Sequence, residues 1–192
     1  MGQLKMYHTM EKIEDYPVKE GFTIRNYQKG DEGAWTEICV QGDLCNPCDD
    51  DTAFRDCTTG IFPTIVPERD VFFACRDGEP VATLTAFIRE NGHGDIHMVA
   101  ALESARGNNL NRAMLSAGLQ SLDRQMTYRP RITALTTDDE RLPAIVGYLK
   151  AGFLPVNYEL GMYDRWKKIC DQLDIHGVEM LNDEGERTGI IL

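Results

Sequence analysis

A predicted β-hairpin most restricts the fold of this chain. Two apolar runs, 70–76 and 80–88, flank the dipeptide Asp77-Gly78. Asp-Gly between two such runs is typical of a tight turn that joins antiparallel strands. The next run, 95–102, is apolar on both faces, which is typical of a central strand. The sequence therefore predicts a sheet that begins with antiparallel neighbours and is covered on both sides.

Helical and extended patterns alternate after this hairpin. Apolar residues at helical spacing predict a helix over 110–122. Two further helices are predicted over 139–152 and 163–173, and strands are predicted over 132–137 and 153–160. This order predicts an α/β (α+β) fold with a mixed, mostly antiparallel central sheet of about six to seven strands and helices on both faces.

The two ends of the chain extend this alternation. The first 20 residues are polar and predict an N-terminal arm, followed by a strand over 22–28 and a helix over 33–41 with Asp31 as its N-cap. Residues 42–69 read as an irregular segment with a short helix near 51–57, typical of a binding loop. Residues 175–192 predict a C-terminal strand extension that turns at Asp183-Glu184-Gly185. With no internal repeat, we predict a single domain over 1–192.

Composition restricts the partners of this chain. The net charge is −11, and an acidic surface repels phosphate backbones, so nucleic acid is not an expected partner. The acidity suits either a cationic small substrate or simple solubility. The N-terminus has no apolar signal segment, and no apolar run reaches the ~18–20 residues that span a bilayer. We therefore expect a cytoplasmic protein without membrane contact.

Six cysteines are present, and in a cytosolic chain they are expected to be thiols. Three sit among apolar residues and predict small core side chains: Cys39, Cys75 and Cys170. Cys45 and Cys48 form a C-x-x-C pair, which suggests either a metal or redox site or ordinary loop thiols. No second pair or histidine set follows at zinc spacing, and Asn46-Pro47 is typical of a turn. We therefore expect no metal.

Two motifs, read together, resemble the GNAT superfamily of acyl-CoA N-acyltransferases. The first is ARGNNLNRAML over 105–115, which follows a strand and opens a helix where that family has Arg/Gln-x-x-Gly-x-Gly/Ala. The second is a set in register with the family's Asn-x-x-Ala-x-x-x-Tyr-x-Lys-x-Gly-Phe: Arg141, Ala144, Tyr148, Lys150, Gly152 and Phe153. Arg141 replaces the family's asparagine. The resemblance covers roughly residues 22–160 and implies a GNAT-like fold.

The resemblance implies a binding site for acetyl-CoA at the first motif. The expected cofactor-binding residues are Val99, Ala100, Ala101, Arg106, Gly107, Asn108, Asn109, Leu110, Asn111, Arg112 and Arg141. A helix N-terminus offers unpaired N–H groups and a positive dipole end to a pyrophosphate. Asn109 and Asn111 replace two glycines of the family. Asparagine tolerates the left-handed region, so Asn109 is expected to hold the turn. Asn111 would either crowd the phosphate or hydrogen-bond to it.

The resemblance also implies direct attack of a neutral amine on the thioester. Tyr148 would be the general acid that protonates the leaving CoA thiolate. Backbone N–H groups near Val99 and Ala101 would stabilise the oxyanion. His97 is the first choice for the base, and Asp95, His93 or water remain open. Because side chains alternate along a strand, Asp95, His97, Val99 and Ala101 are expected to share one face.

These observations predict an acetyl-CoA-dependent N-acetyltransferase, a transferase of the acyltransferase class, that acts on a small-molecule primary amine. The acceptor pocket is expected near residues 35–65, with Asp43, Asp49, Asp50 and Asp51 as acidic candidates and Trp35, Phe54, Phe62 and Tyr158 as lining candidates. Three alternatives remain: a non-catalytic CoA-binding or regulatory protein, a protein or peptide N-acetyltransferase, and a metal or redox protein built on the C-x-x-C pair. Homodimerisation through the tail strands is also an expectation.

Overall fold

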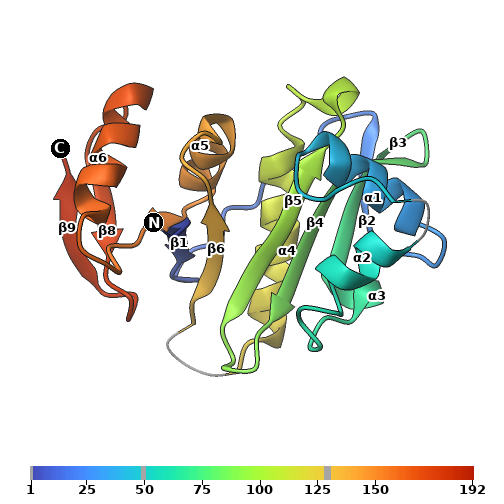
Figure 1. Cartoon of the computed structure of the whole chain (residues 1–192), viewed down its shortest axis with the longest axis horizontal. Helices are drawn as coiled ribbons and strands as arrows, with labels where there is room; N and C mark the ends of the chain where they lie inside the picture. The colour runs from blue at the N-terminus through green and yellow to red at the C-terminus, as the bar shows by residue number, and fades with distance from the viewer. Residues whose placement is uncertain (1, 49–50, 128–130) are drawn as a thin grey trace.

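A computed structural model describes residues 2–48, 51–127 and 131–192 of the chain. Seven strands form one sheet in the order β2-β3-β4-β5-β6-β1-β7 (Figure 1). The strands are β1 Leu4–His8, β2 Phe22–Asn26, β3 Val71–Arg76, β4 Glu79–Ile88, β5 Gly94–Ala101, β6 Thr133–Thr137 and β7 Leu154–Pro155. Neighbours are antiparallel except β5 and β6, which are parallel. The predicted mixed, mostly antiparallel sheet is confirmed.

Helices cover both faces of this sheet. They are α1 Glu32–Gln41, α2 Thr52–Cys57, α3 Pro67–Asp70, the 3-10 turn η1 Glu103–Ala105, α4 Leu110–Gln125, α5 Leu142–Lys150 and α6 Met162–Leu173. Strand β3 shows how the faces are divided. Phe72 and Ala74 pack in the core that contains α4, whereas Phe73 and Cys75 pack in the core that contains α1. This period of two places one apolar layer on each side of the sheet.

The N-terminal segment departs from the prediction. The predicted polar arm is wrong for residues 4–8, because they form β1, which pairs with both β6 and β7. Leu4 and Met6 are fully buried in the core that contains α4. Only five residues carry this alternation, and the polar residues around them hid it. At the other end, the strand predicted over 153–160 is shortened to β7, and α3 was not predicted.

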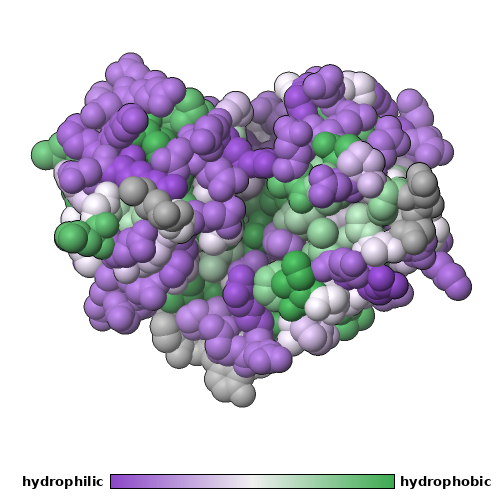
Figure 2. Space-filling model, viewed as in Figure 1, coloured by the Kyte–Doolittle hydropathy of each residue, from purple (hydrophilic) through white to green (hydrophobic). Residues whose placement is uncertain are grey.

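Strands β5 and β6 pair over only two positions. Gly94 lies opposite Thr133 and Asp95 opposite Ala134, and beyond them the strands diverge. Figure 1 shows the two halves of the sheet separating at this point. Figure 2 shows a hollow on the same face, between two lobes. Backbone groups on the inner edge of β5 after Asp95 therefore lack a sheet partner on β6 and can serve a ligand.

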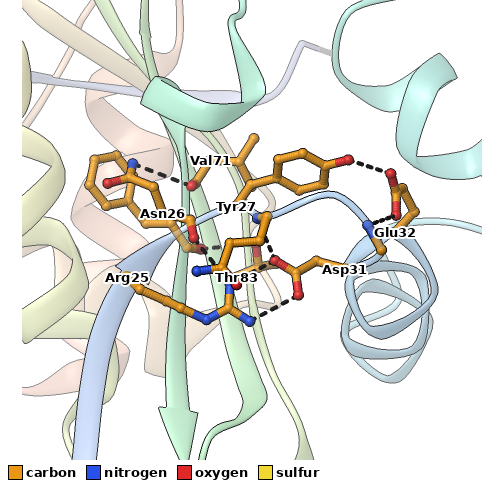
Figure 3. Close-up of polar contacts among 10 residues, drawn as sticks. Arg25, Asn26, Tyr27, Asp31, Glu32, Val71 and Thr83 are labelled. Atoms are coloured by element: carbon orange, nitrogen blue, oxygen red, sulfur yellow. Dashed lines mark hydrogen bonds and ion pairs between the residues drawn. The ribbon is translucent and has the colours of Figure 1, made fainter.

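Carboxylates of the chain itself surround the start of α1 (Figure 3). Asp31 occupies the predicted N-cap position. Its carboxylate accepts two hydrogen bonds from Arg25, of 2.6 and 2.9 Å, and one from the backbone N–H of Gln28 at 2.7 Å. Glu32 accepts hydrogen bonds from the Tyr27 hydroxyl and from the backbone N–H of Gly30. This network fixes the angle at which β2 leads into α1.

The C-terminal residues form the predicted hairpin. Strands β8 Val178–Leu181 and β9 Arg187–Ile191 pair in antiparallel register. A bridge between Val156 and Leu181 attaches the hairpin to the end of the main sheet, and α6 packs against β9. Among the helices within the described ranges, none combines the length and the apolar composition needed to cross a bilayer.

Candidate active site

The turn between β5 and α4 exposes a row of backbone N–H groups. Gly107 and Asn109 have positive φ angles of 78° and 57°, so the prediction that Asn109 holds a left-handed turn is confirmed. Within the described part of the chain, no acceptor is hydrogen-bonded to the backbone N–H groups of residues 107–111. Because the N-terminal dipole of the 16-residue helix α4 points at the same place, this turn suits an anion.

Positive side chains gather at this turn in a chain of net charge −11. The Lys19 ammonium lies 2.7 Å from Oδ1 of Asn108. The Asn108 amide is fixed in turn, because it donates to the carbonyl of Ala105 at 2.9 Å. The Arg112 guanidinium lies 4.0 Å from the ring centre of Tyr16. The first turn of α4 contains no acidic residue, so the local potential favours a negatively charged ligand.

Arg106 and Arg141, both expected to contact CoA, meet at the C-terminal end of α1. Arg106 donates to the carbonyl of Gln41, and Arg141 donates to the carbonyls of Gly42 and Asp43, each at 3.0 Å. Arg141 thereby connects the start of α5 to the end of α1. The structure brings the two arginines together. Besides these backbone oxygens, Arg106 lies 3.5 Å from the Glu103 carboxylate and Arg141 lies 3.4 Å from the Asp138 carboxylate.

Asn111 points away from the turn and toward α5. A Cβ atom built on Gly147 would overlap Nδ2 of Asn111, which shows how closely the amide lies over that glycine. The Oδ1 atom of Asn111 is buried and has no hydrogen-bond partner among the described residues. The side chain therefore does not crowd the turn, and it presents an unsatisfied acceptor between α4 and α5.

A bulge in β5 changes the face of the sheet on which the following side chains lie. Thr85 lies opposite His97 and Thr83 opposite Ala100, so β5 carries one extra residue, and Met98 has a φ of 53°. Val99 packs in the core that contains α4, whereas His97 contacts the α1–α2 side. The prediction that Asp95, His97, Val99 and Ala101 share one face is therefore wrong, because strict alternation does not continue through a bulge.

Two cavities meet between the diverging strands. A cavity of about 150 Å³ is lined by residues of β4, β5, α4 and α5: Ala82, Val99, Ala100, Ala101, Asn111, Met114, Ala144 and Tyr148. A cavity of about 450 Å³ includes Asp43, Leu44 and Phe62 from the α1–α2 side of the sheet. Val99, Ala144 and Tyr148 line both cavities. Two ligands that entered from opposite faces would meet at these three residues.

Tyr148 is the polar side chain at this junction. It is 6% exposed and lies edge-on to Phe153 with ring centres 6.2 Å apart. No hydrogen bond joins its hydroxyl to any other residue that the structure describes. Burial raises the pKa of Tyr148 to about 12, and the charge of Arg141 opposes this shift. The phenol is therefore protonated at neutral pH and has a proton to donate.

Two of the three predicted bases line the larger cavity. Nε2 of His97 lies 3.0 Å from the carbonyl oxygen of Cys57. A carbonyl only accepts, so Nε2 carries the proton and Nδ1 is the acceptor in the neutral ring. Burial lowers the pKa of His97, which keeps the ring neutral. Asp95 is 3% exposed and burial raises its pKa to about 6. His93 lies in the turn after β4 and does not line the cavity.

The predicted acceptor region is divided between cavity and core. Asp43 and Phe62 line the larger cavity, whereas Trp35 and Phe54 are buried in the α1 core. The Tyr158 hydroxyl donates to the carbonyl of Gln3 at 2.6 Å. Asp49 and Asp50 lie outside the described residues, and Asp51 lines a separate groove beside α1.

Sequence reasoning missed Arg89 as a cavity residue. Its signal was a cation directly after the apolar run 80–88, across the turn from Asp95, and in the structure Nε of Arg89 lies 2.6 Å from Oδ2 of Asp95.

The predicted core cysteines, Cys39, Cys75 and Cys170, are buried. Cys45 is half-buried and Cys48 is exposed. Within the ranges that the structure describes, no three metal-ligating side chains converge on one point.

Comparison with known proteins agrees with the fold. The model of the acetyltransferase (GNAT) family matches residues 13–153. No relative was found among curated protein sequences. A GCN5-related N-acetyltransferase from Sphaerobacter thermophilus is similar in structure, with a TM-score of 0.63 and 22% identity over 79% of this chain and 47% of that one. An acetyltransferase of the GNAT family from Colwellia psychrerythraea has a TM-score of 0.58 and 14% identity over 80% and 53%.

A shorter protein shares the fold as well. The ribosomal-protein-S18-alanine N-acetyltransferase from Escherichia coli has a TM-score of 0.53 and 16% identity over 68% of this chain and 76% of its own. The family match covers more than half of the sequence, so this chain belongs to the GNAT acetyltransferase family, a family of acyltransferases. It spans about half the length of the first two structures named above.

Proposed function

We propose that this protein transfers the acetyl group of acetyl-CoA to the primary amine of a small molecule within a ternary complex. The observation that carries the proposal is the meeting of two cavities at Tyr148, one reached from the α4–α5 side and the other from the α1–α2 side. Direct transfer requires this arrangement, because amine and thioester must come into contact without a covalent enzyme intermediate.

The described residues fit acetyl-CoA. The unpaired N–H groups of residues 107–111, with Lys19 and Arg112 beside them, would hold the pyrophosphate. Oδ1 of Asn111 would accept a hydrogen bond from an amide N–H of the pantetheine arm, which satisfies a buried oxygen that otherwise has no partner. Arg106 and Arg141 lie close enough to exchange a carbonyl partner for a phosphate oxygen.

Each chemical requirement has a residue at the junction or along the larger cavity. Acetyl-CoA supplies an activated acetyl group as a thioester. Tyr148 holds its proton at neutral pH and would donate it to the departing thiolate. The bulged backbone near Val99 would offer N–H groups to the carbonyl oxygen. Neutral His97, through Nδ1, would accept the proton of the attacking amine directly or through water, and Asp95, farther along the larger cavity, would accept it only through water.

Isothermal titration with acetyl-CoA and with free CoA tests the proposal first. Micromolar binding, followed by acetylation of members of an amine library with release of free CoA thiol, would support it. Binding without turnover of any amine would favour a non-catalytic CoA-binding protein, the alternative suggested by Asn109 and Asn111 in place of glycines. Turnover of peptide amines alone would identify a protein or peptide N-acetyltransferase. No binding at millimolar ligand would overturn the proposal.

A further inference from the structure

Arg89 stands at the end of the larger cavity in an unusually fixed position. Its Nε donates to Oδ2 of the buried Asp95 at 2.6 Å, and its guanidinium lies 5.0 Å from the ring centre of Phe62. Among the residues that the structure describes, none accepts a hydrogen bond from Nη1 or Nη2 of Arg89. The planar group is therefore anchored on one edge and one face, and its two terminal nitrogens remain available.

These nitrogens border open space on two sides. Arg89, Phe62 and Ile61 line both the larger cavity and a neighbouring groove of about 350 Å³ that continues to Asn91. The larger cavity therefore extends from Tyr148 at one end to Arg89 at the other. Asp95 and Val99 are four positions apart on β5, and at ~3.3 Å per position this is roughly 13 Å before the bulge shortens it.

The charges along this cavity are unequally distributed. Asp43 and Asp138 lie toward the Tyr148 end, where Asp138 pairs with Arg141 at 3.4 Å. At the opposite end, the Asp95 carboxylate is already engaged by Arg89, and Glu90 lines only the neighbouring groove. A molecule that presented an amine to Tyr148 would thus place its far end against the open edge of Arg89.

We propose, building on the function proposed above, that Arg89 binds a carboxylate of the acceptor, so that the substrate is an aminocarboxylate whose two charged ends lie roughly 10 Å apart. A guanidinium offers two parallel N–H donors that match the two oxygens of a carboxylate. Asp95 acts as a positioning residue, because it holds the guanidinium by Nε and leaves Nη1 and Nη2 free to bind a ligand in the cavity. The Phe62 ring lies against one face of the guanidinium and restricts its rotation.

A series of straight-chain ω-aminocarboxylates of increasing length tests this proposal, each compared with its ω-amino amide. We expect one length to be optimal, with kcat/KM for the carboxylate about 10- to 100-fold above that for the amide. Arg89→Lys retains a cation beside Asp95 but loses the two parallel N–H donors. It should reduce the carboxylate-to-amide ratio of kcat/KM to near one. Acetyl-CoA affinity, measured without an acceptor, should stay unchanged. Arg187→Gln, which removes an exposed arginine paired with Glu11 and Glu179, is the control.

Equal turnover of carboxylate and amide by the wild type would overturn the assignment, and so would a preference that survives in Arg89→Lys. Titration with the N-acetylated ω-aminocarboxylates measures the same contact without catalysis. If no amine is acetylated, the proposed function fails, but weaker product binding by Arg89→Lys than by the wild type would still support the carboxylate site. Absence of product binding to the wild type would reject it. The two failures are therefore distinguishable.

Discussion

The starts of α1 and α4 face the same physical requirement and meet it differently. Each helix begins with unpaired N–H groups and a positive dipole end. Around the start of α1, the chain supplies its own anions, the carboxylates of Asp31 and Glu32. These accept hydrogen bonds from Arg25 and from the backbone N–H groups of Gln28 and Gly30, which precede the helix. At the start of α4, five consecutive N–H groups, those of residues 107–111, lack an acceptor among the described residues.

The difference separates a structural helix start from one that we propose to bind a ligand. The α1 network consists of partners that the chain already contains, so its role is complete without a ligand. The α4 turn combines positive φ angles, nearby cations and no acidic residue in the first helical turn. An anion bound there would satisfy groups that otherwise contact only water. Substitutions should therefore affect stability at one site and acetyl-CoA at the other.

Burial raises the pKa of Tyr27, beside the start of α1, and of Tyr148, which lies on α5 and shares a cavity with α4. These two tyrosines give the largest expected contrast. Tyr148→Phe should lower kcat by about 100- to 1000-fold, because it removes the proposed proton donor, while acetyl-CoA affinity changes by less than about threefold. Tyr27→Phe removes the hydrogen bond to Glu32 and should cost about 1–2 kcal/mol of unfolding free energy, with kcat unchanged. Steady-state kinetics and urea unfolding of both variants give the comparison. Unchanged turnover in Tyr148→Phe would exclude this residue as the acid.

Giving α4 an anion of its own should weaken cofactor binding. Asn109→Asp keeps a side chain that tolerates the left-handed region and places a carboxylate beside the expected pyrophosphate. Each of two negative charges on the pyrophosphate, at ~6 Å from this carboxylate in water, is repelled by about 0.7 kcal/mol. The sum of about 1.4 kcal/mol corresponds to about a tenfold rise in the Kd of acetyl-CoA. Asn109→Gly preserves the turn without the charge and should bind as well as the wild type or more tightly. Equal affinity in all three proteins, measured by titration at low salt, would place the pyrophosphate elsewhere.

Acidification should affect the α1 start. The Arg25 guanidinium lowers the pKa of Asp31 below its usual range. The folded state therefore binds this proton less readily than the unfolded chain, so the stabilisation is complete above pH ~4 and is lost as the pH falls through the lowered pKa. Asp31→Asn should cost about 1–2 kcal/mol at pH 7, and the difference from the wild type should shrink below pH ~4. A difference that stays constant in urea unfolding from pH 7 to pH 2 would contradict this account.

The sequence predicted regular elements better than it predicted where they meet. The hairpin of β3 and β4 and the helix α4 followed from turn chemistry and periodicity, because those signals are local. The place of β1 between β6 and β7 did not, since five residues between polar neighbours do not reveal a distant partner. The bulge at Met98 was not predicted either, because nothing in the sequence of 95–102 marks an interruption of the strand. The two bases and Val99 were therefore assigned to one face that the folded strand divides.

Asn111 should produce the smallest effect and the clearest division between stability and binding. Its Oδ1 is buried without a partner among the described residues, so Asn111→Ala should remove an unsatisfied group and raise the unfolding free energy by about 1 kcal/mol. The same substitution should weaken acetyl-CoA binding by about fivefold, because the pantetheine arm loses an acceptor. At the α1 start, stability and acetyl-CoA affinity should not change in opposite directions, since Asp31→Asn should lower stability and leave acetyl-CoA affinity unchanged. Higher stability with unchanged affinity in Asn111→Ala would show that the ligand does not reach this oxygen, and the cofactor site would then be limited to the turn over residues 107–111.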